Sequence, residues 1–201
     1  MILIACAVAK ELGALRPRPH VEVLATGVGV VEAAASVSRA LAQSTYDLVI
    51  SAGIAGAFEG AADVGESVVV SDEMMEFDRE DGTPIALPDG AAVIDRAASD
   101  LTLVDRLAEL GYRSVRGITV ARVTATGASA ARLRAFGCGV ETMEGYGVLR
   151  AAEIAGVAAI EVRGISNIVC DRAANRWNFS AGASGAEKVL NALLSLVAAD
   201  G

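Results

Sequence analysis

Two glutamates three positions apart, in the segment GVETMEGYGVLRAA (139–152), are residues whose types and spacing suggest chemistry. Glu141 and Glu144 flank Met143 where a predicted strand passes into a predicted helix. Acids in a first helical turn favour the positive end of the helix dipole by about 0.3–1 kcal/mol each, so helix electrostatics is one explanation. The other is a functional site, and the segment alone does not decide between them.

Glu11 adds a third acid, because it follows the predicted N-terminal strand in AVAKELGAL. A solvated acid that opens a helix is the simpler explanation. If Glu11 instead lies beside Glu141 and Glu144, apolar surroundings raise the pKa of such a carboxyl group toward neutrality, as a general base requires.

The segment RGISNIVCDRAANRWNF (163–179) places an amide and an aromatic side chain after another buried strand. Asn167 either caps the loop or reads the edge of a heterocycle, because its amide donates and accepts hydrogen bonds at once. Trp177, the one tryptophan of the chain, lies in a polar loop, and a large aromatic ring there is typical of a binding surface.

Two glycine-containing stretches follow strands as well. TGVGVVEAA (26–34) lacks the third glycine of a dinucleotide fingerprint, and no acid follows at the distance which that fold requires. SAGIAGAFEG (51–60) is explained either by tight packing or by a backbone cradle for a ligand, formed by Ile54, Ala55 and Gly56.

The elements that position these residues alternate between apolar strands and helices. The strands are predicted at 1–8, 21–30, 46–53, 64–73, 112–126, 138–142 and 157–166, and the helices at 30–43, 101–111, 143–156 and 181–200. Residues 72–90 are predicted to form a loop or hairpin. This alternation predicts an α/β fold, a single domain over 1–201 with a central mixed, mostly parallel β-sheet flanked by helices.

Ligands of such sheets bind at the carboxyl ends of the strands. The segments expected there are Val8–Glu11, Thr26–Gly29, Ser51–Gly56, Val123–Thr126, Glu141–Glu144 and Ser166–Asp171. The acids and glycines described above are concentrated in these segments, so we expect one site to draw on several of them.

Composition narrows the function classes. The chain has 201 residues, of which 53% are hydrophobic and 4% aromatic, with a mean hydropathy of +0.47, so we expect a packed core of small aliphatic side chains. A formal net charge of −8 argues against nucleic acid and against an anionic membrane surface as partners.

Three cysteines without a CxxC pair and a single histidine, His20, argue against a zinc site and against a Ser-His-Asp triad. We expect the cysteines to be reduced. The N-terminal run has no basic leader and meets Lys10 and Glu11 too early for a signal or a membrane span, so a cytoplasmic location is expected.

Several of these motifs together resemble the nucleoside phosphorylase and nucleosidase superfamily, in order and spacing, from residue 1 to about 199. They are AVAKELGAL, TGVGVVEAAAS, DLVISAGIAGAF, DVGESVVVSDE, VETMEGYGV and VRGISNIV. The most specific are VETMEG and VRGISN. Within the superfamily the chain looks most like the futalosine hydrolases, enzymes of menaquinone biosynthesis that release hypoxanthine from futalosine.

The resemblance implies a role for each acid. Breaking an N-ribosidic bond passes through an oxocarbenium-like state, and carboxylates bind that state more strongly than the substrate as the sugar becomes cationic. By resemblance Glu144 binds the ribose 2′-hydroxyl, Met143 packs on the sugar, Glu141 supports the hydroxyls, and Glu11 activates water.

Asn167 matches the residue that faces the purine. The resemblance implies a 6-oxopurine, because nucleosidases that release adenine carry aspartate there. The N7 proton donor stays open between solvent and Asp171. Phosphorylases hold phosphate with an arginine and a threonine, and here Ser51 and Ile54 stand at those positions, which favours water as the nucleophile.

The family commonly stacks the base on a phenylalanine that RVTATGAS lacks, so stacking falls to Trp177, Phe179 or an aliphatic wall. Arg172, Arg176 or a neighbouring subunit are candidates for binding the carboxyphenyl end of the substrate.

Hydrolysis of futalosine is thus the expected function. The alternatives are a methylthioadenosine or adenosylhomocysteine nucleosidase and a non-catalytic nucleoside-binding module. No cofactor is expected, and the resemblance implies a homo-oligomer, a dimer or larger. No metal ligand is expected. The expected catalytic residues are Glu11, Glu144 and Asn167, and the expected substrate-binding residues are Ile54, Ala55, Gly56, Glu141, Thr142, Met143, Asp171 and Trp177.

Overall fold

The computed structural model describes residues 1–77, 83, 85–171 and 176–199. Its strands are β1 (Ile2–Cys6), β2 (Val21–Ala25), β3 (Leu48–Ala57), β4 (Ser67–Met75), β5 (Arg96–Ala98), β6 (Arg113–Thr119), β7 (Val140–Thr142) and β8 (Ala158–Ile168). The helices are α1 (Val30–Gln43), α2 (Leu101–Glu109), α3 (Gly127–Arg134), α4 (Gly145–Ala155) and α5 (Phe179–Ala199), and a short 3-10 helix, η1, spans Ala9–Leu12.

The strands form one mixed sheet, as expected. Within the described residues the pairs β1–β2, β1–β3, β3–β8, β4–β6 and β6–β7 are parallel, and β3–β7, β4–β5 and β4–β8 are antiparallel. Because β3, β8, β4, β6 and β7 pair in a ring, this part of the sheet closes on itself. The closure brings β7, with Glu141, beside the end of β3.

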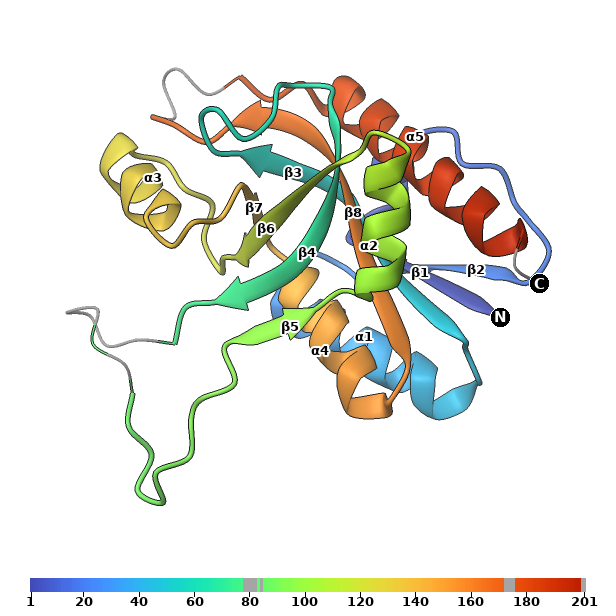
Figure 1. The fold of residues 1–201 in the computed structure, drawn as a ribbon, viewed down its shortest axis with the longest axis horizontal. Helices are drawn as coiled ribbons and strands as arrows, with labels where there is room; N and C mark the ends of the chain where they lie inside the picture. Colours follow the sequence, from blue (N-terminus) through green and yellow to red (C-terminus); the bar gives the residue numbers. More distant parts are fainter. Residues whose placement is uncertain (78–82, 84, 172–175, 200–201) are drawn as a thin grey trace.

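Helices cover the sheet on both sides (Figure 1). β1 shows why: its alternate residues Leu3 and Ala5 pack with α1 and α4, whereas Ile4 and Cys6 lie in the cluster that includes α5. This two-residue alternation, apolar on both faces, is the pattern of a strand buried between helix layers. The strong apolar run at the N-terminus is thereby explained.

The sequence prediction was wrong in several local details. The strand expected over 46–53 continues to Ala57, and helix α3 was not predicted. The strand expected over 112–126 ends at Thr119, and α3 follows after a loop. β5 was not predicted, and neither was the extension of β4 to Met75. The strand expected over 21–30 ends at Ala25, before Gly27 and Gly29, whose φ angles of 90° and 102° do not fit a strand. Part of the loop expected at 72–90 lies outside the described residues.

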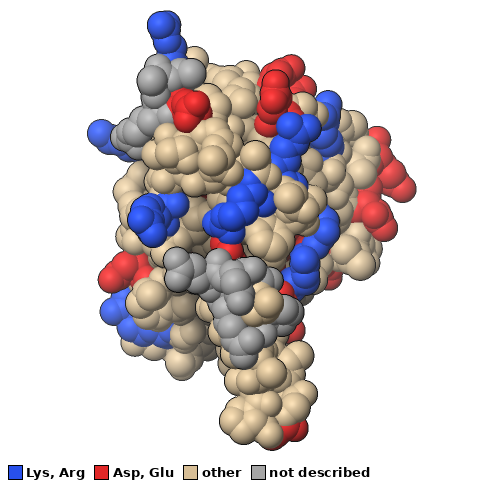
Figure 2. All heavy atoms as spheres, turned by 90° about the vertical axis from the view of Figure 1, so that its left-hand side faces the viewer, with Lys and Arg blue, Asp and Glu red and all other residues tan. Residues whose placement is uncertain are grey.

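Figure 2 shows the side of the molecule that carries α3, with basic and acidic side chains intermixed. Arg132 of α3 pairs with Glu76 after β4, and Arg116 of β6 pairs with Asp72 at 3.3 Å. Such exposed pairs each contribute at most about 1 kcal/mol. The first links α3 to the segment after β4, and the second links β6 to β4.

No helix among the described residues is long and apolar enough to cross a membrane.

The close approach of α5 to β8 depends on Gly164. A Cβ on Gly164 would overlap the backbone of α5 at Gly182 and Ala186, atoms that cannot move aside as a flexible side chain can. We expect Gly164→Ala to lower the free energy of unfolding by about 1–3 kcal/mol through overpacking, measured by urea denaturation. Ala158→Ser, at the exposed start of the same strand, is the control and should change it by less than about 0.5 kcal/mol. Equal urea midpoints for the two variants would contradict this packing.

Candidate active site

A cavity of about 140 Å³ opens where β1, β3 and β8 end and α4 begins. This is the edge at which ligands of parallel sheets bind. Ten of the eleven predicted site residues line it: Glu11, Ile54, Ala55, Gly56, Glu141, Thr142, Met143, Glu144, Asn167 and Trp177. Ala7, Val28, Val123 and Ser166 complete the lining.

Glu144 lies between the beginnings of two helices. It is the N-cap residue of α4, and its Oε1 accepts a hydrogen bond of 2.8 Å from the backbone N–H of Gly29, the N-cap residue of α1. The positive ends of both helix dipoles therefore favour its negative charge. The side chain is 7% exposed, and this hydrogen bond leaves its second oxygen for a ligand.

Glu11 reaches the cavity from η1. Its Oε2 accepts a hydrogen bond of 3.2 Å from the N–H of Ile54, and Gly53 makes room for it, since a Cβ there would overlap the carboxylate. Burial raises the pKa of Glu11 above its ordinary value, while Arg163 and the Ile54 N–H lower it and Glu144 raises it. Because burial outweighs the lowering contributions, Glu11 is a stronger proton acceptor than a solvent-exposed glutamate.

Glu141 has both of its oxygens engaged by one residue of the loop between β6 and α3. Oε1 accepts from the N–H of Thr124 at 3.2 Å, and Oε2 accepts from the Thr124 hydroxyl. Burial raises the pKa of Glu141, and the two bonds from Thr124 lower it. Glu141 therefore fixes the loop that carries Val123 at the cavity, and its oxygens keep further lone pairs for a ligand.

Ser166 and Asn167 both line the cavity although they are consecutive residues of β8. Neighbouring residues of a regular strand point to opposite faces. Here the pairing of β3 with β8 shifts between Ala55 and Gly56, so that Ser166 is an extra residue on β8. This bulge turns both side chains toward the site.

The bulge also orients the Asn167 amide. The Ser166 hydroxyl lies 2.8 Å from Asn167 Oδ1 and 3.2 Å from the carbonyl oxygen of Ala55. A hydroxyl that donates to Oδ1 leaves the amide nitrogen of Asn167 as the group to face a ligand. Asn167 is 4% exposed, so its neighbours restrict its rotation.

Asp171 is the one predicted site residue that does not line the cavity. Its Oδ1 accepts a hydrogen bond of 2.6 Å from the N–H of Gly127, at the start of α3. It thus joins the segment after β8 to the loop before α3. Trp177 lies at the mouth of the cavity and is 54% exposed.

The remaining predictions concern stacking groups and cations. Phe179 does not line the cavity, whereas the apolar side chains of Val28, Ile54 and Val123 do, together with Trp177. Arg172 lies outside the described residues, and Arg176 is exposed and not part of the lining.

Among the described residues no group of three His, Cys, Asp or Glu side chains is placed to hold a metal ion.

The rule that ligands bind at strand ends contains the signal for three of the four additional lining residues. Val28, Val123 and Ser166 lie in segments that the rule selects, but nothing in their side chains drew attention to them. Arg163, which lies near Glu11 but does not line the cavity, is inside β8 and not at a strand end, so the rule does not select it.

The sequence matches the Phosphorylase superfamily over residues 13–199. A futalosine hydrolase from Streptomyces coelicolor is 38% identical over 177 residues, covering 78% of this chain and 71% of the relative. A futalosine hydrolase from Thermus thermophilus is 31% identical over 181 residues, covering 86% of this chain and 80% of the relative.

Solved structures show the same fold. The native structure of futalosine hydrolase from Helicobacter pylori has a TM-score of 0.81 at 15% identity and 97% coverage of both chains. A 5′-methylthioadenosine/S-adenosylhomocysteine nucleosidase from Streptococcus pneumoniae, with a transition-state inhibitor, has a TM-score of 0.81 at 20% identity, covering 98% of this chain and 99% of that one.

The family match extends over nearly the whole chain. The sequence relatives and the fold point to the same superfamily. This chain belongs to the Phosphorylase superfamily, and within it to the futalosine hydrolase family.

Proposed function

We propose that this protein hydrolyses the N-ribosidic bond of futalosine, releasing hypoxanthine and dehypoxanthine futalosine in menaquinone biosynthesis. The observation that carries the proposal is the convergence of Glu11, Glu144 and Asn167, from three separate segments, on one cavity. The activity named for the sequence relatives supports it.

In the proposed chemistry, one group of residues binds the ribose and Glu11 activates the attacking water. Glu144 holds the ribose 2′-hydroxyl and Met143 packs on the sugar, while Glu141 supports the hydroxyls. As positive charge develops on the ribose, these carboxylates stabilise the transition state more than the ground state. Glu11 accepts the proton of the attacking water, which adds to the cationic carbon of the sugar. The hypoxanthine leaves with the electrons of the N-ribosidic bond and takes up a proton from solvent, since Asp171 does not line the cavity.

Water is the proposed nucleophile because no lysine or arginine stands among the described residues that line the cavity. Arg163 is the arginine beside Glu11, yet it does not line the cavity, and its Nε and Nη2 donate to Glu161 and Ser51. A phosphate dianion without a free guanidinium has little to bind it there.

The substrate assay tests both points at once. Purified protein is incubated with futalosine, inosine and methylthioadenosine, with and without phosphate, and the released base is quantified. We expect hypoxanthine from futalosine at the same rate in both buffers. Strict dependence on phosphate would contradict hydrolysis. Preferential release of adenine from methylthioadenosine would favour the second candidate, a methylthioadenosine nucleosidase.

Asn167 is proposed to select a 6-oxopurine, since N7 and O6 of hypoxanthine both accept hydrogen bonds and the amide nitrogen donates. Asn167→Asp replaces that donor by a group that accepts from a 6-amino substituent. We expect the ratio of kcat/KM for futalosine to that for its 6-amino analogue to fall by about tenfold or more. Asn191→Asp, outside the cavity, is the control. An unchanged ratio would count against this role.

Glu11 is proposed to work as its ionised form, so activity should fall as pH drops through its pKa. Because burial raises that pKa, the acidic limb of kcat/KM should lie above the ordinary range of a glutamate. Glu11→Gln should lower kcat by at least about a hundredfold with little change in KM. Glu109→Gln, at the exposed last residue of α2, is the control. Wild-type kcat in Glu11→Gln would exclude Glu11 as the base.

We also propose that the protein is cytoplasmic and a homo-oligomer, a dimer or larger, with no nucleic-acid or membrane partner. The net charge of −8 supports the latter point. Val28 and Trp177, both on the lining and more than half exposed, give the rim of the cavity an apolar surface that a second copy would cover.

A further inference from the structure

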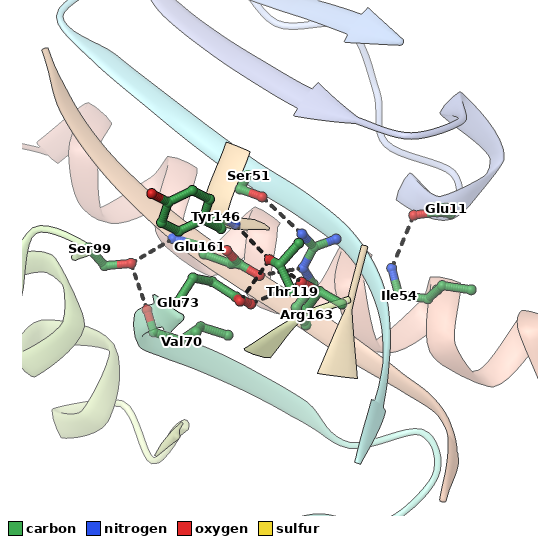
Figure 3. A network of polar contacts seen from close by, with 11 residues as sticks. Glu11, Ser51, Ile54, Val70, Glu73, Ser99, Thr119, Tyr146, Glu161 and Arg163 are labelled. Carbon is green, nitrogen blue, oxygen red and sulfur yellow. Dashed lines mark hydrogen bonds and ion pairs between the residues drawn. The ribbon is translucent and has the colours of Figure 1, made fainter. Parts of the chain in front are cut away.

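Behind the wall of the cavity lies a cluster of three ionisable side chains that the proposed mechanism does not use. Glu73 of β4 and Glu161 of β8 are 0% exposed, and Arg163 of β8 is 1% exposed. Figure 3 shows them in a polar network that extends from Ser99 toward Glu11. Burying three ionisable groups is costly unless their charges and hydrogen bonds are matched.

One oxygen of this cluster has no partner in the hydrogen-bond network. Arg163 Nε donates to Glu161 Oε1 at 2.8 Å, but Glu161 Oε2 is buried with no hydrogen bond among the described residues. Both oxygens of Glu73 accept hydrogen bonds, from Thr142 at 3.0 Å and from Thr119 at 2.9 Å. An acceptor left unpaired in the interior destabilises the fold, and more so if it is charged.

A proton on Glu73 would satisfy that oxygen. Gly145 has no side chain, and the space that its Cβ would take is bordered by oxygens of both Glu73 and Glu161. Two carboxylates so close together cannot both be ionised in a dry interior. Burial, and then the charge of Glu161, raise the pKa of Glu73 well above its ordinary value. Neutral Glu73 can then donate to Glu161, which keeps the negative charge beside Arg163.

Arg163 faces a second carboxylate on its other side. Its Nη2 donates to the Ser51 hydroxyl at 2.9 Å, and its Nη1 and Glu11 Oε2 both border the space that a Cβ on Gly53 would take. The guanidinium thus lies between Glu161 and Glu11, and it is bound directly to Glu161.

We propose that Glu161, hydrogen-bonded to a neutral Glu73, is a positioning residue that holds Arg163 in an ion pair of its own and so keeps Arg163 from pairing with Glu11. The inference rests on the proposed role of Glu11 as the base. If Arg163 closed on Glu11, it would stabilise the carboxylate and make it a weaker base. The groups that face Glu11 are Arg163 from β8, Glu144 at the start of α4 and the Cys6 thiol of β1.

Two isosteric variants separate this proposal from a merely structural role. In Glu73→Gln the side-chain NH2 group replaces the proposed O–H donor to Glu161, so the charge beside Arg163 is unchanged. In Glu161→Gln the charge partner of Arg163 is lost. The kcat/KM of futalosine hydrolysis is measured against pH for both variants and for the wild type.

We expect the acidic limb of Glu161→Gln to move to lower pH by about one unit, with a plateau about tenfold lower. We expect the limb of Glu73→Gln to stay at the wild-type pH. An unmoved limb in Glu161→Gln, or an equal displacement in both variants, would overturn the proposal.

A second measurement does not depend on activity. Protein with ¹³C-labelled glutamate carboxyls is titrated by NMR, with the signals of Glu11 and Glu73 assigned by Glu11→Gln and Glu73→Gln. We expect Glu73 to stay protonated at neutral pH in the wild type, and Glu11 to titrate at lower pH in Glu161→Gln. If the wild type releases no hypoxanthine from futalosine, the proposed function fails, and this titration still decides whether Glu161 controls Glu11. A Glu73 that is ionised at neutral pH would overturn the inference.

Folding stability gives a third check, which holds even if Glu161→Gln folds poorly. A group whose pKa is raised on folding stabilises the native state at low pH, and that contribution is lost as pH rises through the folded-state pKa. The urea midpoint of the wild type should therefore fall more than that of Glu73→Gln as pH rises above the ordinary glutamate range. Parallel curves would contradict a proton on Glu73.

Discussion

Much of this structure is arranged around one buried positive charge, that of the Arg163 guanidinium. Although burial lowers it, the pKa of Arg163 is raised by the surrounding carboxylates, first of all by Glu161. A cation that is 1% exposed needs both a counter-charge and a hydrogen-bond partner for each donor it turns inward. Glu161 and Ser51 supply these partners, and Gly53 supplies the space between the guanidinium and Glu11.

Glycines provide the space in which these polar groups lie so close together. Gly117 and Gly145 stand where any side chain would collide with the carboxyl oxygens of Glu73, and Gly53 does the same for Glu11. Their φ angles are not in the left-handed region, so it is the space and not the backbone conformation that requires glycine. The site therefore depends on residues that contribute no atoms to its chemistry.

The sequence predicted the fold class because its signals were local. The run from Ile2 to Cys6 is apolar on both faces, and the Ala-rich segment of α1 has high helix propensity. Those signals do not specify pairing. The antiparallel contact of β3 with β7, which closes the ring of strands, joins Gly56 to Glu141 across a large sequence separation, and no periodicity encodes it.

The candidate site was predictable to the extent that it follows the ends of strands. Glu11, Glu144 and Asn167 are chemically distinctive and lie where strands end, so sequence patterns and the family resemblance select them. The bulge at Ser166 could not be predicted, because its register shift arises from how β3 and β8 pair. The same holds for the buried acids, since Glu73 and Glu161 lie within strands where only tertiary packing shows that their carboxyl groups meet.

Trp177 has a practical consequence that follows from its place and its number. It is the one tryptophan in the sequence, it stands at the mouth of the cavity, and 54% of its surface meets water. Indole emission depends on how far the ring is solvated. A molecule that enters the cavity changes the surroundings of the one indole ring in the chain, so the emission of Trp177 reports occupancy of the cavity without any label.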